Sequence, residues 1–257
     1  MIPNSKKFVI ITGGLGFLGS FFSENLSKNG FNVILIDKNR PKNPYQKKIL
    51  KKCFLWKRVD ITKENEISAF YKKLKLKKIK IDYLINNAAI DSIPKNNSKK
   101  NHLPELKVWN NELAVSLTGS YLMIKYFGED MLKRKFGKIV NIGSDLSIIA
   151  PNQSLYSDFG NFLKPATYSV IKHGQLGLTK YFASLYAKNK VLVNMLSPGP
   201  IFNNQKKSFV SKLNNLIPMG RMADRSDLIE TLLFLLNDNN NYITGQNILV
   251  DGGKTLI

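Results

Sequence analysis

The sequence predicts an α/β fold in which a seven-stranded parallel sheet lies between two layers of helices. Short runs rich in valine, isoleucine and leucine alternate with longer segments of helical spacing along the whole chain. The short runs are nearly continuously apolar, which is typical of strands buried on both faces of a parallel sheet. The repeated strand–helix order indicates a doubly wound layer sandwich of the Rossmann type.

The expected elements follow one another without a break. Seven segments have the composition of strands: residues 8–12, 32–37, 54–59, 81–85, 138–142, 191–196 and 247–250. Six have the apolar spacing of helices: roughly 16–29, 64–77, 110–134, 166–188, 205–216 and 226–237. No repeat, linker or change of composition marks a second unit, so we expect residues 1–257 to form a single domain.

Composition limits the functions to consider. The chain is 43% hydrophobic, which is typical of a globular protein, and no apolar run reaches the roughly 18–20 residues that span a bilayer. The few residues before the first expected strand leave no room for a signal peptide. Cys53 is the only cysteine in the sequence, so it has no internal disulfide partner. We therefore expect a cytoplasmic protein that does not enter a membrane.

The formal net charge of +21 raises the question of nucleic-acid binding. The lysines are scattered over the whole chain, and the densest run, residues 72–80, alternates with leucine and isoleucine like a solvated helix face. No aromatic side chains are interleaved with a basic patch. We expect no nucleic-acid partner. The two histidines, His102 and His173, and Cys53 lack the spacing of metal ligands, so no metal is expected.

A glycine-rich turn joins the first expected strand to the first expected helix. Its sequence from Thr12 to Gly19 is TGGLGFLG. Glycine allows positive φ and close approach of the backbone to a pyrophosphate, and the following helix offers free amides to phosphates. The strand before and the helix after are the context that a dinucleotide-binding turn requires. The residues expected to contact the dinucleotide here are Gly13, Leu15, Gly16, Phe17, Leu18 and Gly19.

Asp37 ends the second expected strand. A carboxylate at this position accepts hydrogen bonds from the adenosine ribose and repels a 2′-phosphate, which favours NAD over NADP. Lys38 and Arg40 stand beside it and would instead attract a 2′-phosphate. We expect NAD to be preferred, with NADP as the alternative.

Tyr168 and Lys172 are spaced i, i+4 near the start of an expected helix, so their side chains share one face. A free phenol titrates near 10, and a nearby ammonium favours the phenolate and lowers its pKa. Such a pair is common by chance, so its weight depends on the surrounding motifs. Residues 90–108 and 145–167 form long connections after strands, and such loops usually border a functional site.

The ordered motifs resemble those of the short-chain dehydrogenase/reductase family over nearly the whole chain. They are the turn at 12–19, Asp60 and Ile61 in VDIT, Asn87, Ala88 and Ala89 in NNAA, Ser144 in NIGS, Tyr168, Lys172, and Pro198 and Gly199 in LSPGP. The segments 220–228 and 244–253 are similar to the closing segments of that family. The stretch 145–174 also resembles a subgroup of flagellin-modification or surface-sugar oxidoreductases.

This resemblance implies an NAD(P)-dependent oxidoreductase acting on an alcohol or ketone of a small-molecule substrate, such as a sugar or nucleotide sugar. Tyr168 would be the acid/base, Ser144 would hydrogen-bond the substrate oxygen, and Lys172 would lower the pKa of the tyrosine and hold the nicotinamide ribose. Asp60 would face the adenine, Asn87 the middle of the cofactor, and the backbone of Ile201 the carboxamide. The two long helices imply a homodimer or homotetramer.

Three departures from the family pattern keep alternatives open. The glycine spacing is more typical of the extended branch, which contains sugar epimerases and dehydratases, although the chain is short for that branch. Ser116 stands where the family has a catalytic asparagine, so Ser116 is a candidate catalytic residue or a sign of a binding protein without catalysis. Ser144 and Tyr168 are 24 residues apart, and we interpret residues 151–165 as an insertion over the active site.

Overall fold

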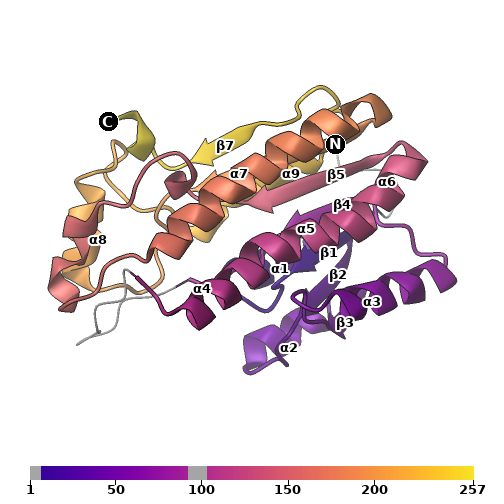
Figure 1. The fold of residues 1–257 in the computed structure, drawn as a ribbon, viewed down its shortest axis with the longest axis horizontal. Coiled ribbons are helices and arrows are strands. Elements are labelled where there is room, and N and C mark those ends of the chain that lie inside the picture. The colour runs from indigo at the N-terminus through magenta and orange to yellow at the C-terminus, as the bar shows by residue number, and fades with distance from the viewer. Residues whose placement is uncertain (1–6, 92–102) are drawn as a thin grey trace.

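The structure is a computed structural model that describes residues 7–91 and 103–257. Its centre is a seven-stranded parallel sheet with the order β3-β2-β1-β4-β5-β6-β7 (Figure 1). The strands are β1 (Phe8–Thr12), β2 (Asn32–Asp37), β3 (Leu55–Arg58), β4 (Tyr83–Asn86), β5 (Gly137–Ile142), β6 (Val191–Pro198) and β7 (Asn247–Val250). The expected fold class is therefore confirmed. The strand order reverses between β1 and β4, which is where a doubly wound sheet opens a crevice for ligands.

Alternate residues of each strand point to opposite faces and build two cores. Ile10 of β1 belongs to the core beneath α3 (Glu64–Leu76) and α7 (Ala166–Tyr186). Val9 and Ile11 belong to the core beneath α1 (Phe17–Lys28) and α9 (Ile229–Leu236). Figure 1 shows α7 on the near face of the sheet. The near-continuous apolar strands of the sequence are explained by burial on both faces.

A long helical rod lies beside α7 on the near face (Figure 1). It consists of α4 (Leu106–Leu113), α5 (Gly119–Met123) and α6 (Glu129–Arg134), joined by π-helical turns at Ala114–Thr118 and Ile124–Gly128. The sequence predicted this helix over 110–134, so the structure extends it by four residues at its start. Residues 92–102 of the expected loop 90–108 lie outside the described residues.

The sequence did not predict α2 (Pro44–Leu50), which follows β2. Asn43 caps this helix by accepting a hydrogen bond from the Gln46 amide at 2.9 Å, and proline occupies the first turn. Gln46 then donates from its side chain to the carbonyl of Leu15 at 2.7 Å. The helix therefore supports the glycine-rich turn.

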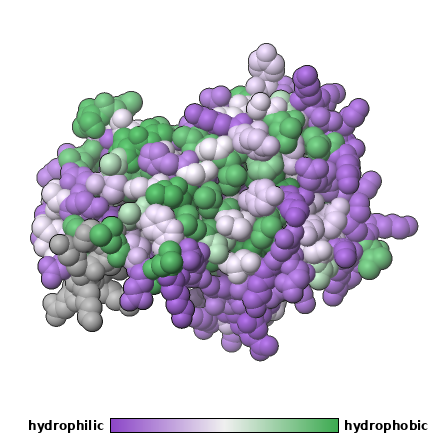
Figure 2. All heavy atoms as spheres, viewed as in Figure 1, coloured by the Kyte–Doolittle hydropathy of each residue, from purple (hydrophilic) through white to green (hydrophobic). Residues whose placement is uncertain are grey.

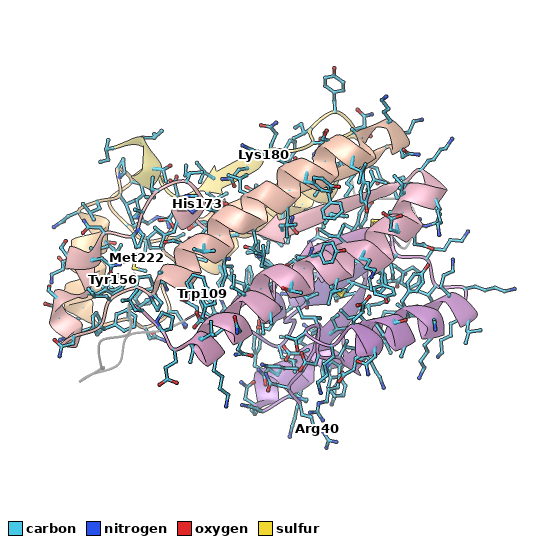
Figure 3. The ribbon with its side chains drawn as sticks, in the orientation of Figure 1. Arg40, Trp109, Tyr156, His173, Lys180 and Met222 are labelled. Carbon is cyan, nitrogen blue, oxygen red and sulfur yellow. The ribbon has the colours of Figure 1, made fainter. Side chains whose placement is uncertain are left out.

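The expected insertion forms a 3₁₀ segment, Gln153–Phe159, and packs on α8 (Lys207–Asn214). Four of its apolar side chains and four from α8 and the residues after it make a separate buried group, which we call the α8 cluster: Leu155, Tyr156, Phe159, Phe162, Phe209, Leu213, Ile217 and Met222. Tyr156 and Met222 are labelled at this end of the molecule in Figure 3. Across 7–91 and 103–257, no helix combines the length and apolar character needed to cross a bilayer.

Candidate active site

A cavity of about 840 Å³ lies at the carboxyl ends of the strands and extends from the glycine-rich turn to the α8 cluster. Its walls include nearly every residue that the sequence singled out, drawn from positions far apart in the chain. They are Gly13, Leu15, Gly16, Phe17, Leu18, Asp37, Asp60, Ile61, Asn87, Ala88, Ala89, Ser144, Tyr168, Lys172, Pro198, Gly199 and Ile201. Gly19 and Ser116 are not among the cavity-lining residues.

The beginning of α1 is built to receive an anion. Gly16 precedes the helix and provides no side-chain cap, and the first turn contains no acidic residue. The first amides of α1 and the positive end of its dipole are thus left without a side-chain acceptor. Gly13 has a φ of +61°, and a Cβ there would lie 2.8 Å from the Cα of Ala88. These features fit a pyrophosphate, whose negative charge the exposed amides would hold.

Gly19 of α1 packs directly against the backbone of this turn. A Cβ at Gly19 would lie 2.2 Å from the carbonyl oxygen of Gly13, so only glycine allows the helix to pack this closely. Asn87 donates from its side chain to the carbonyls of Thr12 and Gly13 at 3.0 and 3.2 Å. The Thr12 hydroxyl in turn accepts hydrogen bonds from the backbone of Asn87 and Ala88. These hydrogen bonds hold the residues after β4 against the glycine-rich turn.

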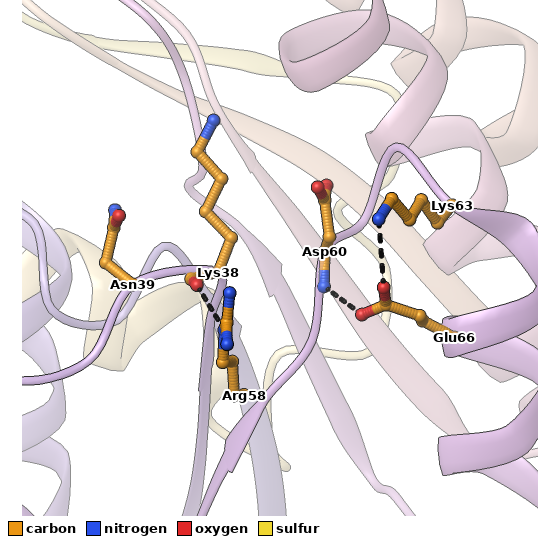
Figure 4. A pocket seen from close by; sticks show the side chains of 6 residues that line it. All are labelled: Lys38, Asn39, Arg58, Asp60, Lys63 and Glu66. Atoms are coloured by element: carbon orange, nitrogen blue, oxygen red, sulfur yellow. Dashed lines mark hydrogen bonds and ion pairs between the residues drawn. The ribbon is translucent and has the colours of Figure 1, made fainter.

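Asp37 lies buried on the cavity wall at the end of β2. Its two carboxylate oxygens accept hydrogen bonds from the amides of Leu15 at 3.1 Å and Asn39 at 2.8 Å. Each oxygen keeps a further lone pair for a ribose hydroxyl. A smaller hollow beside it, of about 380 Å³, is lined by Lys38, Asn39, Arg58, Asp60, Lys63 and Glu66 (Figure 4). Cationic and anionic side chains therefore both face the adenosine end of the cavity.

Tyr168 and Ser144 meet at the other end of the cavity. Ser144 follows β5, and its hydroxyl donates to Asp145 at 2.7 Å while it accepts from the Leu146 amide at 3.2 Å. Burial and the nearby Asp91 carboxylate raise the pKa of the Tyr168 phenol above its usual range, and a hydrogen bond with Ser144 acts in the opposite direction. This net direction is opposite to the one expected from the lysine alone, because burial is the largest influence on the phenol.

Lys172 lies one turn after Tyr168, with its ammonium 5.6 Å from the centre of the phenol ring. The ammonium donates to the backbone carbonyl of Ile142 at 2.9 Å and to Oε1 of Gln175 at 3.3 Å. Burial lowers the pKa of Lys172 to about 8. The amine is therefore held by two acceptors on the cavity wall, and burial makes it a weaker base than a solvated lysine.

Ser116 lies in the π-helical turn at Ala114–Thr118 and is fully buried. Its hydroxyl accepts a hydrogen bond from the Ile90 amide at 3.4 Å, and its backbone carbonyl accepts from the side chain of Gln175 at 3.2 Å. Gln175 thus connects Lys172 to the position where the family pattern has asparagine. Sequence reasoning missed Gln175, although its i+3 spacing from Lys172 places it on the same helix face.

Two buried lysines at the site were also missed. Lys254, near the C-terminus, forms an ion pair with Asp145, and both side chains are at most 10% exposed. Lys164 forms an ion pair with Asp91, and its ammonium lies 4.0 Å from the centre of the Tyr168 ring. The partners are separated by 109 and 73 residues, so no local pattern indicates them. In the described part of the chain, no three His, Cys, Asp or Glu side chains gather as a metal site would require.

Comparisons with known proteins agree with this geometry. The sequence model of the family described as Enoyl-(Acyl carrier protein) reductase matches residues 18–255. An NAD-dependent glycerol dehydrogenase of Listeria innocua is 30% identical over 98% of this chain and 95% of its own length. A 3-oxoacyl-(acyl-carrier-protein) reductase of Buchnera aphidicola is 33% identical, with 98% of each chain covered.

A solved structure extends the likeness to three dimensions. The crystal structure of a short chain dehydrogenase from Leptospira borgpetersenii with bound NAD⁺ has a TM-score of 0.85 and 31% identity. The match covers 98% of this chain and 93% of that one.

Proposed function

Because the chain belongs to the short-chain dehydrogenase/reductase family, we propose that it transfers a hydride between NAD or NADP and an alcohol or ketone, with Tyr168 moving the proton. The observation that carries this proposal is that Ser144, Tyr168 and Lys172 line the same cavity as the glycine-rich turn. A dinucleotide held at that turn and a reacting oxygen held at the phenol would share one enclosed space.

The bound dinucleotide would supply or accept the hydride; the residues of this chain position it and move the proton. The amides at the start of α1 would hold its pyrophosphate, and Asp37 its adenosine ribose. Lys172 would face the nicotinamide ribose. Since burial keeps Tyr168 protonated, the phenol is ready to donate its proton to the oxygen of a ketone as that oxygen gains charge. Oxidation of an alcohol uses the reverse transfer.

Asp145 sets the orientation of the Ser144 hydroxyl in this proposal. The single proton of the hydroxyl is donated to Asp145 in the structure, and it would turn to the Tyr168 oxygen when the phenol ionises, which is the direction that lowers the tyrosine pKa. A substrate oxygen that enters would compete with Asp145 for the serine proton. Ser144 and Tyr168 together would then hold the substrate oxygen from two sides.

We further propose NAD as the preferred dinucleotide. Asp37 supports this preference because a buried carboxylate beside the ribose opposes a 2′-phosphate. Lys38 and Arg58 at the neighbouring hollow favour a phosphate instead, so the preference is a balance between charges. Polar side chains at the outer end of the cavity suit a substrate with several hydroxyl groups; they include Asn152, Asn203, Asn204 and Gln205.

We propose that the chain works as a single domain in the cytoplasm and as a homodimer or homotetramer. Apolar side chains are exposed on α7 and on the adjacent rod, among them Tyr121, Val170, Tyr181 and Leu185. Figure 2 shows hydrophobic residues in green near the centre of this face, as well as at its edge. A second copy would cover the exposed apolar side chains of α7 and the rod. Sedimentation at a mass above 29.1 kDa, the mass of one chain, tests this part.

The experiment for the function is turnover of a panel of polyols, sugar acids and nucleotide sugars with NAD or NADP, followed by the absorbance of the reduced nicotinamide. We expect oxidation of at least one hydroxylated substrate, with higher kcat/KM for NAD. Absence of turnover over the whole panel in both directions would count against an oxidoreductase. Interconversion of a sugar without net change in the nicotinamide would favour the epimerase or dehydratase alternative.

A further inference from the structure

Lys164 is a buried cation at the substrate end of the cavity. Its side chain is 9% exposed, and it lines the cavity next to Tyr168. Gln153 holds its backbone from both sides: Lys164 N donates to Oε1 at 2.9 Å, and Nε2 donates to the Lys164 carbonyl at 3.1 Å. The ammonium lies over the phenol ring, 4.0 Å from its centre. Lys164 is thus positioned by the fold rather than by a flexible surface loop.

The carboxylate paired with Lys164 is much more exposed than the carboxylate paired with Lys254. Asp145, the partner of Lys254, is buried and also accepts hydrogen bonds from Ser144 and the Leu146 amide. Asp91, the partner of Lys164, has a side chain that is 51% exposed. Because the Asp91 carboxylate is half exposed, water can solvate it when another anion takes its place beside Lys164. Lys254 is therefore held by a buried carboxylate, whereas the carboxylate beside Lys164 can be displaced by another anion.

We propose that Lys164 binds a carboxylate of the substrate, which takes the place of Asp91, so that the substrates are hydroxy or keto acids of the sugar-acid kind. This inference rests on the proposed function and names its substrate class. A buried ammonium needs an anion beside it, and the free protein supplies one from Asp91. A substrate carboxylate would offer the same charge and the same hydrogen-bond acceptors at the same place.

The charges at this end of the cavity fit a singly charged group. Among the described residues at this end of the cavity, Lys254 is engaged by Asp145, and Lys164 provides one exchangeable positive charge. Lys206 also lines the cavity, but its amine faces the carbonyl of Asp158 at 3.3 Å and is exposed to solvent. A phosphate carries about two charges near neutral pH and would need a second cation of the same kind. Because Lys164 lies against the Tyr168 ring, the bound carboxylate would be close in the substrate to the reacting carbon.

The test uses binding rather than turnover. Calorimetric titrations of the NAD-saturated protein compare three acids with their neutral partners: gluconate with glucitol, tartrate with threitol, and glycerate with glycerol. We expect at least one acid to bind about 10- to 100-fold more tightly than its partner, the range for a charge-assisted hydrogen bond. Lys164→Met should remove this difference, and Lys164→Arg should retain most of it. Asp91→Asn should strengthen binding of the acid because it removes the competing carboxylate.

Lys180→Met is the matched control, because this exposed lysine on α7 lies away from the cavity (Figure 3). It should leave both members of each pair unchanged. Equal binding of acid and neutral partner in all three pairs would overturn the inference, as would an equal loss for both members in Lys164→Met. Tighter binding of glycerol 3-phosphate than of glycerate would assign the site to phosphate instead. Acid binding that depends on Lys164, without turnover of any acid, would overturn the sugar-acid substrate class. Absence of turnover over the whole panel of polyols, sugar acids and nucleotide sugars would instead overturn the proposed function and leave carboxylate binding in place.

Discussion

Lys172 donates a hydrogen bond from its ammonium to Oε1 of Gln175, 3.3 Å away and three residues on in α7. The same amide donates to the backbone carbonyl of Ser116 at 3.2 Å. All three residues are buried. The glutamine therefore links the amine beside the phenol to the helical rod, at the place where the sequence has serine rather than the asparagine of the family pattern.

Gln175→Met tests this link with a side chain of similar size. The variant leaves the Lys172 ammonium with one of its two acceptors, the Ile142 carbonyl, so its pKa should fall further below 8. We expect kcat to fall by about tenfold, the effect of losing one hydrogen bond, and its pH profile to shift. NADH binding, measured by fluorescence, should change little. An unchanged pH profile would show that Gln175 only fills space.

Lys254→Met leaves Asp145 buried without its cation, and the loss of one partner of a buried pair costs about 3–5 kcal/mol. The free energy of unfolding, measured in urea, should fall by this order. The double variant Lys254→Met with Asp145→Asn removes the stranded charge and should recover much of the loss. A double variant as unstable as the single one would show that the ion pair is not the cause.

Asp37→Asn tests the choice of dinucleotide. The change keeps an acceptor for the Leu15 amide and removes the charge that opposes a 2′-phosphate. We expect the ratio of kcat/KM for NADP to that for NAD to rise by about tenfold or more, since a change of about 1.4 kcal/mol is one factor of ten. Steady-state kinetics with both dinucleotides measure the ratio. A ratio that stays constant would remove Asp37 from cofactor selection.

The lowered pKa of Lys172 predicts a stability that depends on pH. Burial lowers the pKa values of Lys172 and Lys138 to about 8, whereas lysine in the unfolded chain titrates near 10.5. Between pH 8 and 10 these two lysines bind more protons in the unfolded chain than in the folded one, so their contribution to the free energy of unfolding rises with pH. Each lysine contributes at most about 1.4 kcal/mol per pH unit.

Lys172→Met should reduce the slope of the free energy of unfolding against pH by the contribution of one lysine. The contribution of Lys138 should remain. Urea unfolding at pH 8, 9 and 10 measures the slope in each variant. Lys180→Met, at an exposed position, serves as the control for the loss of one charge. The same slope in Lys172→Met and the native sequence would show that Lys172 titrates normally in the folded protein.

The parts of the fold that repeat a pattern could be predicted from the sequence. All seven strands were expected, because burial on both faces leaves an apolar run in each. Helix α2 was missed, although Asn43 and Pro44 are the cap and first-turn residues that mark a helix start. The contact of Gly19 with a dinucleotide stays a prediction; in the structure its missing Cβ allows close packing against the Gly13 carbonyl.

The site residues that belong to the ordered motifs could be predicted from the sequence. The contacts between residues far apart in the chain could not. Asp91 and Lys164 lie 73 residues apart and meet only because β4 and β5 are neighbours in the sheet. Burial decides the direction of the Tyr168 pKa, and burial cannot be read from a four-residue spacing. Gln175 shares a helix face with Lys172, so attention to i+3 neighbours would have found it.

The role of Tyr168 as the group that moves the proton is tested most directly by comparing the turnover of Tyr168→Phe with its binding of NADH. The substitution removes one hydroxyl from a ring that is held between Lys164 and Ser144, so the fold and the dinucleotide cavity should persist. We expect kcat to fall by at least about 100-fold, the contribution of a positioned proton donor, while the dissociation constant for NADH stays within about a factor of three of the native value. Turnover close to that of the native sequence would show that Tyr168 does not move the proton.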